Sequence, residues 1–126
     1  MSIAAQATRT HVTIYSPALD GPAQRLHQPQ GWSPSWTGDV PVESLEEIFT
    51  YFNRIYDEDD RRLRRRGYHL PSLSTGDIII RELPIGVTYH VVGYFGFNEI
   101  TQKQYLAIRH AKDPRLAALR YTVSHN

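Results

Sequence analysis

The stretch SLSTGDIIIRELPIGVTYHVVGYFGF, residues 72–97, constrains the fold most because apolar and polar residues alternate along it. Alternation with a period of two is typical of β-strands with one buried face. It predicts a hairpin whose first arm spans about 77–83, with a turn at 84–86. The second arm carries one apolar row: Val87, Tyr89, Val91, Phe95 and Phe97. Gly93 and Gly96 interrupt this arm and predict a bulge or a bend.

The segment HVTIY, residues 11–15, predicts a short strand by the same alternation. Val12 and Ile14 share one face, and His11, Thr13 and Tyr15 share the other. The ten residues at the start of the chain are small and polar, so we expect a frayed N-terminus over 1–10.

The segment ESLEEIFTYFN predicts a helix over about 45–53. Ser44 and Glu47 have the spacing of a capping box, in which each side chain binds the backbone amide of the other residue. Helical spacing then gives one apolar stripe typical of a core helix: Leu45, Ile48, Phe49 and Phe52.

Residues 16–41 hold five prolines and three glycines, a density that predicts a long loop without extended regular elements. Trp32 and Trp36 are expected to pin this loop, and loops of this length often carry function.

The tail predicts two further helices, over 102–110 and 114–120. Thr101 with Gln104 forms a second capping box, and Asp113 before Pro114 is typical of an N-cap followed by proline. The alternative is that QYLAIR and LRYTV are strands, because alternation fits these short pieces as well.

The chain has 126 residues and ordinary hydrophobic and charged fractions of 40% and 21%, which predict a single domain over 1–126. The expected fold is α+β, with a small antiparallel sheet around a central hairpin and two or three short helices. There is no cysteine, so disulfides are excluded and a cytoplasmic location is expected. No apolar run could span a membrane, so no membrane partner is expected. A net charge of +1 does not by itself indicate nucleic-acid binding.

The order LEEIFTYFN, LPSLSTGDIII and TYHVVGYFGF resembles YodL-like domains, and the match spans 44–98. In that family a helix ending in Phe-Asn precedes a Ser-Leu-Ser-x-x-Asp strand and a Tyr-x-Val-x-x-x-Gly-Phe strand. The matching residues are Leu45, Ile48, Phe52, Asn53, Ser72, Leu73, Ser74, Asp77, Ile78, Tyr89, Gly96 and Phe97. The chain departs from the pattern in its longer segment between Phe-Asn and Ser-Leu-Ser, and in its Pro-rich front and its tail.

Domains of this kind are small modules of bacterial, phage and other mobile-element proteins. We expect a non-enzymatic binding or accessory protein of phage or mobile-element type that acts by protein-protein contact. Modulation of a host system is what the resemblance implies. No cofactor is implied.

Two local features bear on catalysis. Asp77 could act as a general base or metal ligand beside Ser72, Ser74 or Thr75, whereas the simpler interpretation is a turn in which Asp77 binds backbone amides. The six histidines lack the spacing of a metal site, and His90 is expected to be half-buried or exposed. No phosphate loop or nucleotide-binding motif is present, so we expect no enzymatic activity.

The segment DEDDRRLRRRG, residues 57–67, predicts a helix whose acids precede its arginines, which gives internal pairs and matches the helix dipole. Arg65 and Arg66 are left without acids one turn earlier. The alternative function is therefore nucleic-acid binding through the Arg61 to Arg66 helix end and nearby aromatic side chains. The residues expected at a partner or nucleic-acid site are Trp32, Trp36, Arg62, Arg65, Arg66, Tyr68 and His69.

Overall fold

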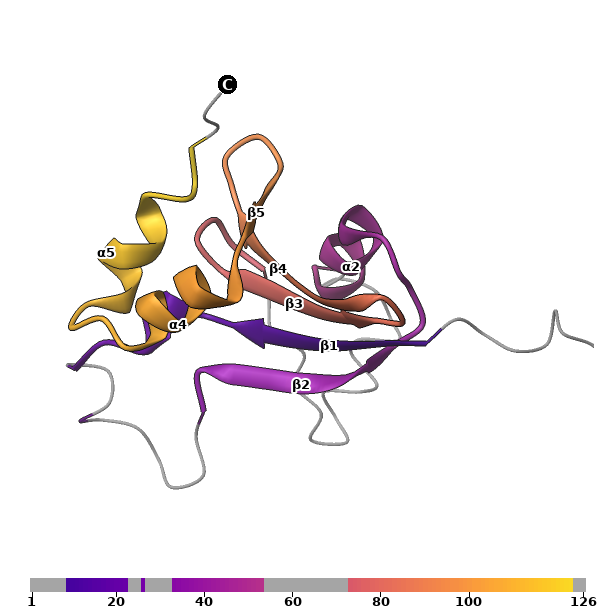
Figure 1. Cartoon of the computed structure of the whole chain (residues 1–126), viewed down its shortest axis with the longest axis horizontal. Helices are drawn as coiled ribbons and strands as arrows, with labels where there is room; N and C mark the ends of the chain where they lie inside the picture. The colour runs from indigo at the N-terminus through magenta and orange to yellow at the C-terminus, as the bar shows by residue number, and fades with distance from the viewer. Residues whose placement is uncertain (1–8, 23–25, 27–32, 54–72, 124–126) are drawn as a thin grey trace, which may run out of the picture.

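Figure 1 shows a computed structural model of the chain, which describes residues 9–22, 26, 33–53 and 73–123. Five strands are present in this part: β1 (Thr10–Tyr15), β2 (Ser35–Val40), β3 (Ile78–Leu83), β4 (Gly86–Val92) and β5 (Phe97–Ile100). The helices are η2, a 3-10 turn (Pro17–Leu19), α2 (Leu45–Phe52), α4 (Gln102–Arg109) and α5 (Pro114–Leu119). None of the helices in the described ranges is long and apolar enough to cross a membrane.

The five strands form one antiparallel sheet in the order β2-β1-β3-β4-β5. The β3–β4 hairpin pairs Ile78 with Val91 and Leu83 with Gly86, so it lies inside the sheet. The predicted α+β fold with a central hairpin is therefore confirmed.

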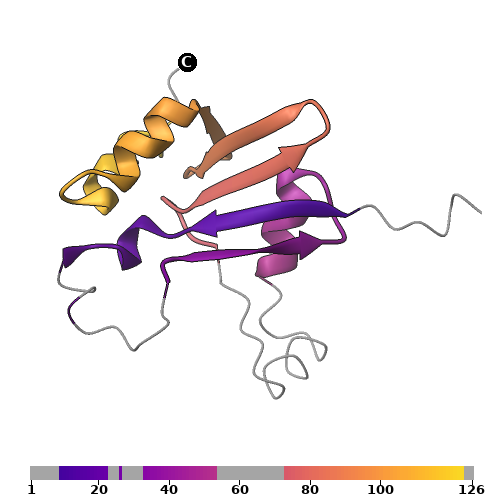
Figure 2. The same ribbon diagram turned by 60° about the horizontal axis from the view of Figure 1, so that its bottom comes forward.

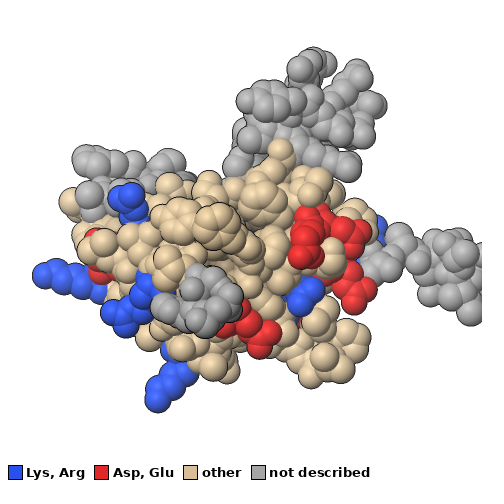
Figure 3. Space-filling model, turned by 90° about the horizontal axis from the view of Figure 1, so that it is seen from above, with Lys and Arg blue, Asp and Glu red and all other residues tan. Residues whose placement is uncertain are grey.

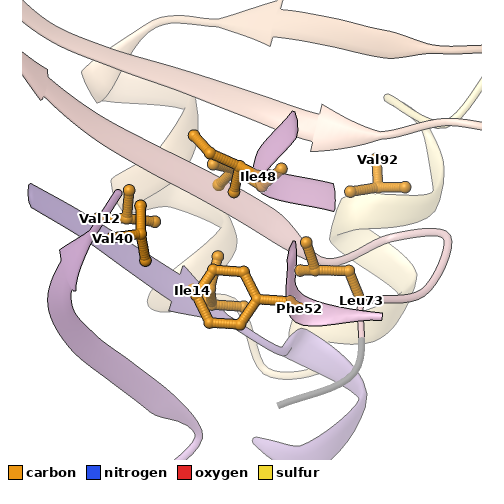
Figure 4. Close-up of a cluster of buried hydrophobic side chains, with 8 residues drawn as sticks. Val12, Ile14, Val40, Ile48, Phe52, Leu73 and Val92 are labelled. Carbon is orange, nitrogen blue, oxygen red and sulfur yellow. The ribbon is translucent and has the colours of Figure 1, made fainter. Parts of the chain in front are cut away.

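Helices cover both faces of the sheet (Figure 2). On one face α2 packs its buried side chains against β1, β2, β3 and β4 (Figure 4), in a cluster of Val12, Ile14, Val40, Ile48, Phe52, Leu73, Ile79 and Val92. On the other face α4 and α5 bury a second cluster, which holds Tyr15, Ile78, Val91, Ile100, Tyr105, Ile108 and Ala118. Adjacent residues of β3, Ile78 and Ile79, belong to opposite clusters because successive strand side chains point to opposite faces.

Helix α2 begins at the predicted capping box. The Glu47 amide donates to Ser44 Oγ at 3.1 Å, and the Ser44 amide donates to Glu47 Oε1 at 3.3 Å. At its other end Asn53 donates through Nδ2 to Leu73 O at 3.1 Å and accepts from the Leu73 amide at 2.7 Å. These two bonds fix the end of α2 to the segment that leads into β3.

The prediction of a loop throughout 16–41 is wrong because β2 lies inside it. Ser35–Val40 pairs with β1 along its whole length, and Pro34 and Pro41 flank the strand instead of interrupting it. Inside β2 the Trp36 ring lies across Gly38, where a Cβ would come within 2.7 Å of the indole Cη2. Gly38 thus leaves the space within the strand that the Trp36 ring occupies.

The predicted interruption at Gly93 and Gly96 is confirmed, but the prediction that one apolar row continues through it to Phe95 and Phe97 is wrong. β4 ends at Val92, a turn occupies 93–96, and β5 begins at Phe97. The turn resets the alternation, so Phe97 faces α2 and packs on Phe49 with ring centroids 6.0 Å apart. Phe95, which was expected in the buried row, is 98% exposed.

The two tail helices are confirmed, and the alternative of strands there is wrong. Strand 11–15 is confirmed as β1, yet Tyr15 is fully buried because α4 covers the Tyr15 end of the face that it shares with His11 and Thr13, which remain partly exposed. His90 was expected to be half-buried or exposed, but it is buried. The predicted helix of the DEDDRRLRRRG segment lies outside the described residues.

Candidate functional site

Large apolar side chains are exposed around the β4–β5 turn and α5. Tyr94 and Phe95 in the turn are 61% and 98% exposed, and Leu116 on α5 is 63% exposed. Leu119 and Val123 are exposed beside them. We refer to these five residues, with Arg115 and Arg120, as the α5 surface. An exposed apolar group of this kind is typical of an interaction site.

A cavity of about 180 Å³ opens within the α5 surface, between η2, the turn before β3, the β4–β5 turn and α5. It is lined by Pro17, Ala18, Thr75, Gly76, Asp77, Tyr94, Arg115, Ala118 and Leu119. The lining combines apolar residues of η2 and α5 with the polar residues Thr75, Asp77 and Arg115, so the cavity suits a group that has both apolar and polar parts.

Asp77 borders the cavity and is 6% exposed. Its Oδ2 accepts from the Ser74 amide at 2.9 Å, and its own amide donates to Ser74 O at 3.0 Å. Gly76 supplies the left-handed residue that this turn requires, with φ of +96°. The turn interpretation of Asp77 is therefore confirmed.

The pKa of the Asp77 carboxyl is also shifted from its ordinary value. Burial raises its pKa to about 6, although hydrogen bonds from the Ser74 backbone and the Ser16 side chain act in the opposite direction. A carboxyl of this kind beside a cavity is a recognised sign of a functional position. It is equally what desolvation imposes on any buried turn aspartate.

The β4–β5 turn holds Tyr94 and Phe95 outward through its backbone. The Gly93 amide donates to Gly96 O at 2.7 Å, and the Tyr94 amide donates to Thr122 O at 3.1 Å. A Cβ at Gly93 would lie 2.9 Å from Thr122 O, so only glycine allows the turn to approach the C-terminal segment this closely. The turn, α5 and Val123 are thereby fixed side by side.

Helix α5 presents its exposed face because its other face is anchored. Asp113 Oδ1 accepts from the Leu116 amide at 3.3 Å, Pro114 follows as the first helical residue, and Pro114 and Ala118 are buried. Since residues three and four apart lie on one side of a helix, Leu116 lies beside Leu119 and Arg120 on the outer face.

An aromatic cluster supports η2, which forms another wall of the cavity. The Tyr15 hydroxyl donates to Asp20 Oδ2 at 2.6 Å, and burial first, then this bond, raises the pKa of Tyr15 above its usual range. The Arg109 guanidinium lies 4.9 Å from the centre of the Tyr15 ring and donates to the Tyr105 hydroxyl at 3.1 Å. Tyr89 stacks on Tyr105 with ring centroids 5.1 Å apart.

Charge is distributed unevenly along the long axis of the molecule (Figure 3). Residues 102–123, which form α4 and α5, contain five Lys or Arg and one Asp. Residues 33–53, which include β2 and α2, contain four Asp or Glu and neither Lys nor Arg. The α5 surface therefore lies at the basic end.

Of the predicted site residues, only Trp36 lies in the described part. It is half-buried on β2 and packs edge-on against Phe52, with ring centroids 5.1 Å apart, so it contributes to the α2 core. Trp32, Arg62, Arg65, Arg66, Tyr68 and His69 lie outside the described residues, and their role stays a prediction.

Sequence reasoning missed the α5 surface. Its one available signal was the GYFG tetrapeptide, in which Gly93 and Gly96 flank two aromatic residues as they would in a turn. Leu116 and Leu119 carried no such signal, because leucines at helical spacing more often face a core.

The remaining polar side chains of the described part are weaker candidates for a functional site. His11 Nδ1 lies 2.8 Å from Asp39 Oδ1 across β1 and β2, but both side chains are about half exposed on the open sheet, as in an ordinary cross-strand pair. His90 Nε2 is buried without a hydrogen-bond partner in the described part, and burial first, then Arg81, lowers the pKa of this imidazole. Within the described ranges no group of three or more His, Asp or Glu is placed to hold a metal ion.

A second cavity, of about 390 Å³, lies along the outer side of α2, lined by Pro41, Val42, Glu46, Glu47, Thr50 and Tyr51. Its two glutamates are exposed and Glu47 is engaged in the helix cap.

No family model, curated protein or solved structure matches this chain.

Proposed function

We propose that this chain is a non-enzymatic binding protein that acts by protein-protein contact, with the α5 surface as its docking face. The observation that carries the proposal is the exposure of Tyr94, Phe95 and Leu116, with Tyr94 also lining the cavity. Aromatic residues and arginine supply most of the binding energy at protein interfaces, and both occur here.

An accessory role in a phage or mobile element, modulating a host system, is part of the proposal and rests on the resemblance to YodL-like domains. A cytoplasmic location rests on the cysteine-free sequence.

Nucleic-acid binding is the second candidate, and the basic charge of residues 102–123 favours it. Exposed aromatic rings beside arginines can stack on single-stranded bases. We rank it second because the α5 surface also holds the aliphatic side chains Leu116, Leu119 and Val123, which suit a protein partner better than a phosphate backbone.

A peptide library displayed on phage and selected against the immobilised full chain tests the proposal. Selected peptides are expected to bind a Phe95→Ser, Leu116→Ser double variant at least about tenfold more weakly, because each serine removes an exposed apolar contact. Ile85→Ser is the matched control, since Ile85 is 93% exposed in the β3–β4 turn at the other end of β4. Peptides that bind the double variant as well as the wild type would contradict the proposal.

A further inference from the structure

Part of the wall of the cavity in the α5 surface is apolar. Pro17 and Ala18 of η2 face Ala118 and Leu119 of α5 across it, and the Tyr94 side chain forms another wall. Its one carboxyl, Asp77, already accepts hydrogen bonds from the Ser74 amide and the Ser16 side chain. The Asp77 carboxyl therefore does not require a cationic ligand, and the charged group of the lining that is left to meet a ligand is Arg115.

Arg115, the one cationic residue of the cavity lining, has no acid paired with it in the described ranges. Arg115 lines the cavity, and Arg120 lies on the outer face of α5 five residues later. Neither forms an ion pair with an acid of the described ranges. The nearest acid in the sequence, Asp113, is engaged by its Oδ1 as the N-cap of α5. Two arginines are thus available to a ligand.

We propose, on the basis of the protein-binding function proposed above, that the α5 surface binds an acidic peptide segment which inserts one apolar side chain into the cavity. Carboxylates on either side of that anchor pair with Arg115 and Arg120. Tyr94 and Phe95 cover the peptide from the β4–β5 turn. Charge complementarity and the apolar walls together select this occupant over a neutral or basic peptide.

The peptide selected in the library experiment provides the test, because its sequence reports the chemistry of the surface. We expect binders that depend on the α5 surface to share one Leu, Ile, Met or Phe with two or more Asp or Glu within about four residues. Two variants then separate the cavity from the rim. Ala18→Leu places an isobutyl group at an exposed position in the cavity wall, with Ala107→Leu on the exposed side of α4 as its control.

Arg115→Glu reverses a rim charge, and Lys103→Glu changes net charge equally at a position that does not line the cavity. Ala18→Leu is expected to weaken the acidic peptide about tenfold by occupying the anchor's space. Arg115→Glu is expected to weaken it at least about threefold at low salt and less at high salt, with little change for Lys103→Glu. Circular dichroism and unfolding curves of each variant establish that it is folded before its affinity is compared.

The outcomes separate the two proposals. Two outcomes would overturn the inference and leave the proposed docking face intact. In the first, peptides that need Phe95 and Leu116 carry no excess of acidic residues. In the second, they bind the Ala18→Leu variant with the same affinity as the wild type. Binders that ignore Phe95 and Leu116 would overturn both. Binding of single-stranded oligonucleotides that outcompetes the peptide would also overturn the inference in favour of a nucleic-acid surface. Salt-dependent self-association that Glu46→Lys abolishes would also overturn the inference. It would mean that the acidic α2 end of a second copy of the chain binds the α5 surface.

Discussion

Replacing Asp77 with asparagine is expected to stabilise the fold at neutral pH and to change it little in acid. Asp77 is almost fully buried, and burial raises its pKa to about 6 in spite of two hydrogen bonds. Asparagine has nearly the same shape, can still accept from the Ser74 amide, and does not ionise. The variant therefore removes the charge and keeps the turn.

The expected magnitude follows from proton linkage. The carboxyl has an ordinary pKa of 3.8 when unfolded and about 6 when folded. Below pH 3.8 the Asp77 carboxyl makes its full contribution to the stability of the wild type. Between pH 3.8 and 6 only the folded chain keeps the carboxyl protonated, so this contribution is lost as the pH rises through 6. The two pKa values differ by an amount worth about 3 kcal/mol at 25 °C. Asp77→Asn should gain about that much over wild type between pH 4 and pH 8.

Urea unfolding of both chains at steps from pH 4 to pH 8 measures the difference. His90 acts in the opposite direction, because its lowered pKa means that stability falls as the pH drops below its ordinary value of 6.5. His90 is present in both chains, so its contribution cancels in the comparison. Glu82→Gln removes an exposed carboxyl of the same strand and reports the effect of net charge alone. A difference that stays constant across this range, or an asparagine variant less stable at pH 8, would refute the reasoning.

Three further substitutions test the packing by their free energies of unfolding in urea. Asn53→Ala removes both hydrogen bonds to Leu73 and should cost about 1–3 kcal/mol, and a cost below about 0.5 kcal/mol would show that water replaces them. Ile48→Ala leaves a cavity in the fully buried face of α2 and should cost roughly 2–5 kcal/mol; an unchanged midpoint would contradict the α2 core. Gly93→Ala brings a Cβ to 2.9 Å from Thr122 O and should lower the free energy of unfolding by about 1–3 kcal/mol. An unchanged free energy of unfolding would show that the C-terminal segment moves away without loss of stability.

The elements that sequence reasoning predicted are those whose signals are local. The capping boxes at Ser44 and Thr101 fix where α2 and α4 begin, since the bonds that start each helix lie within four residues. The β3–β4 hairpin was found for a similar reason, because its two arms and their turn are contiguous. The fold class follows from these pieces.

The elements that were missed depend on distant partners. β2 is a strand because β1, twenty or more residues away, supplies its hydrogen bonds, whereas its flanking prolines and Gly38 predict a loop. Tyr15 is buried because α4, from a distant part of the chain, covers it. No local pattern reveals which face of a strand a remote helix will cover.

The α5 surface could not have been identified from the sequence for a related reason. Leu116 and Ala118 are both apolar residues of one short helix, and only the docking of α5 against η2 and the second core cluster determines that Ala118 is buried and Leu116 exposed. Small residues, Pro114 and Ala118, occupy the inner face, so the helix lies close to η2 and α4 and its larger leucines remain outside. A helix that places its small residues inward and its large ones outward gains less from folding than the reverse arrangement would give. Burial of those leucines by a partner would recover that difference, which is the reason for proposing the α5 surface as the docking face.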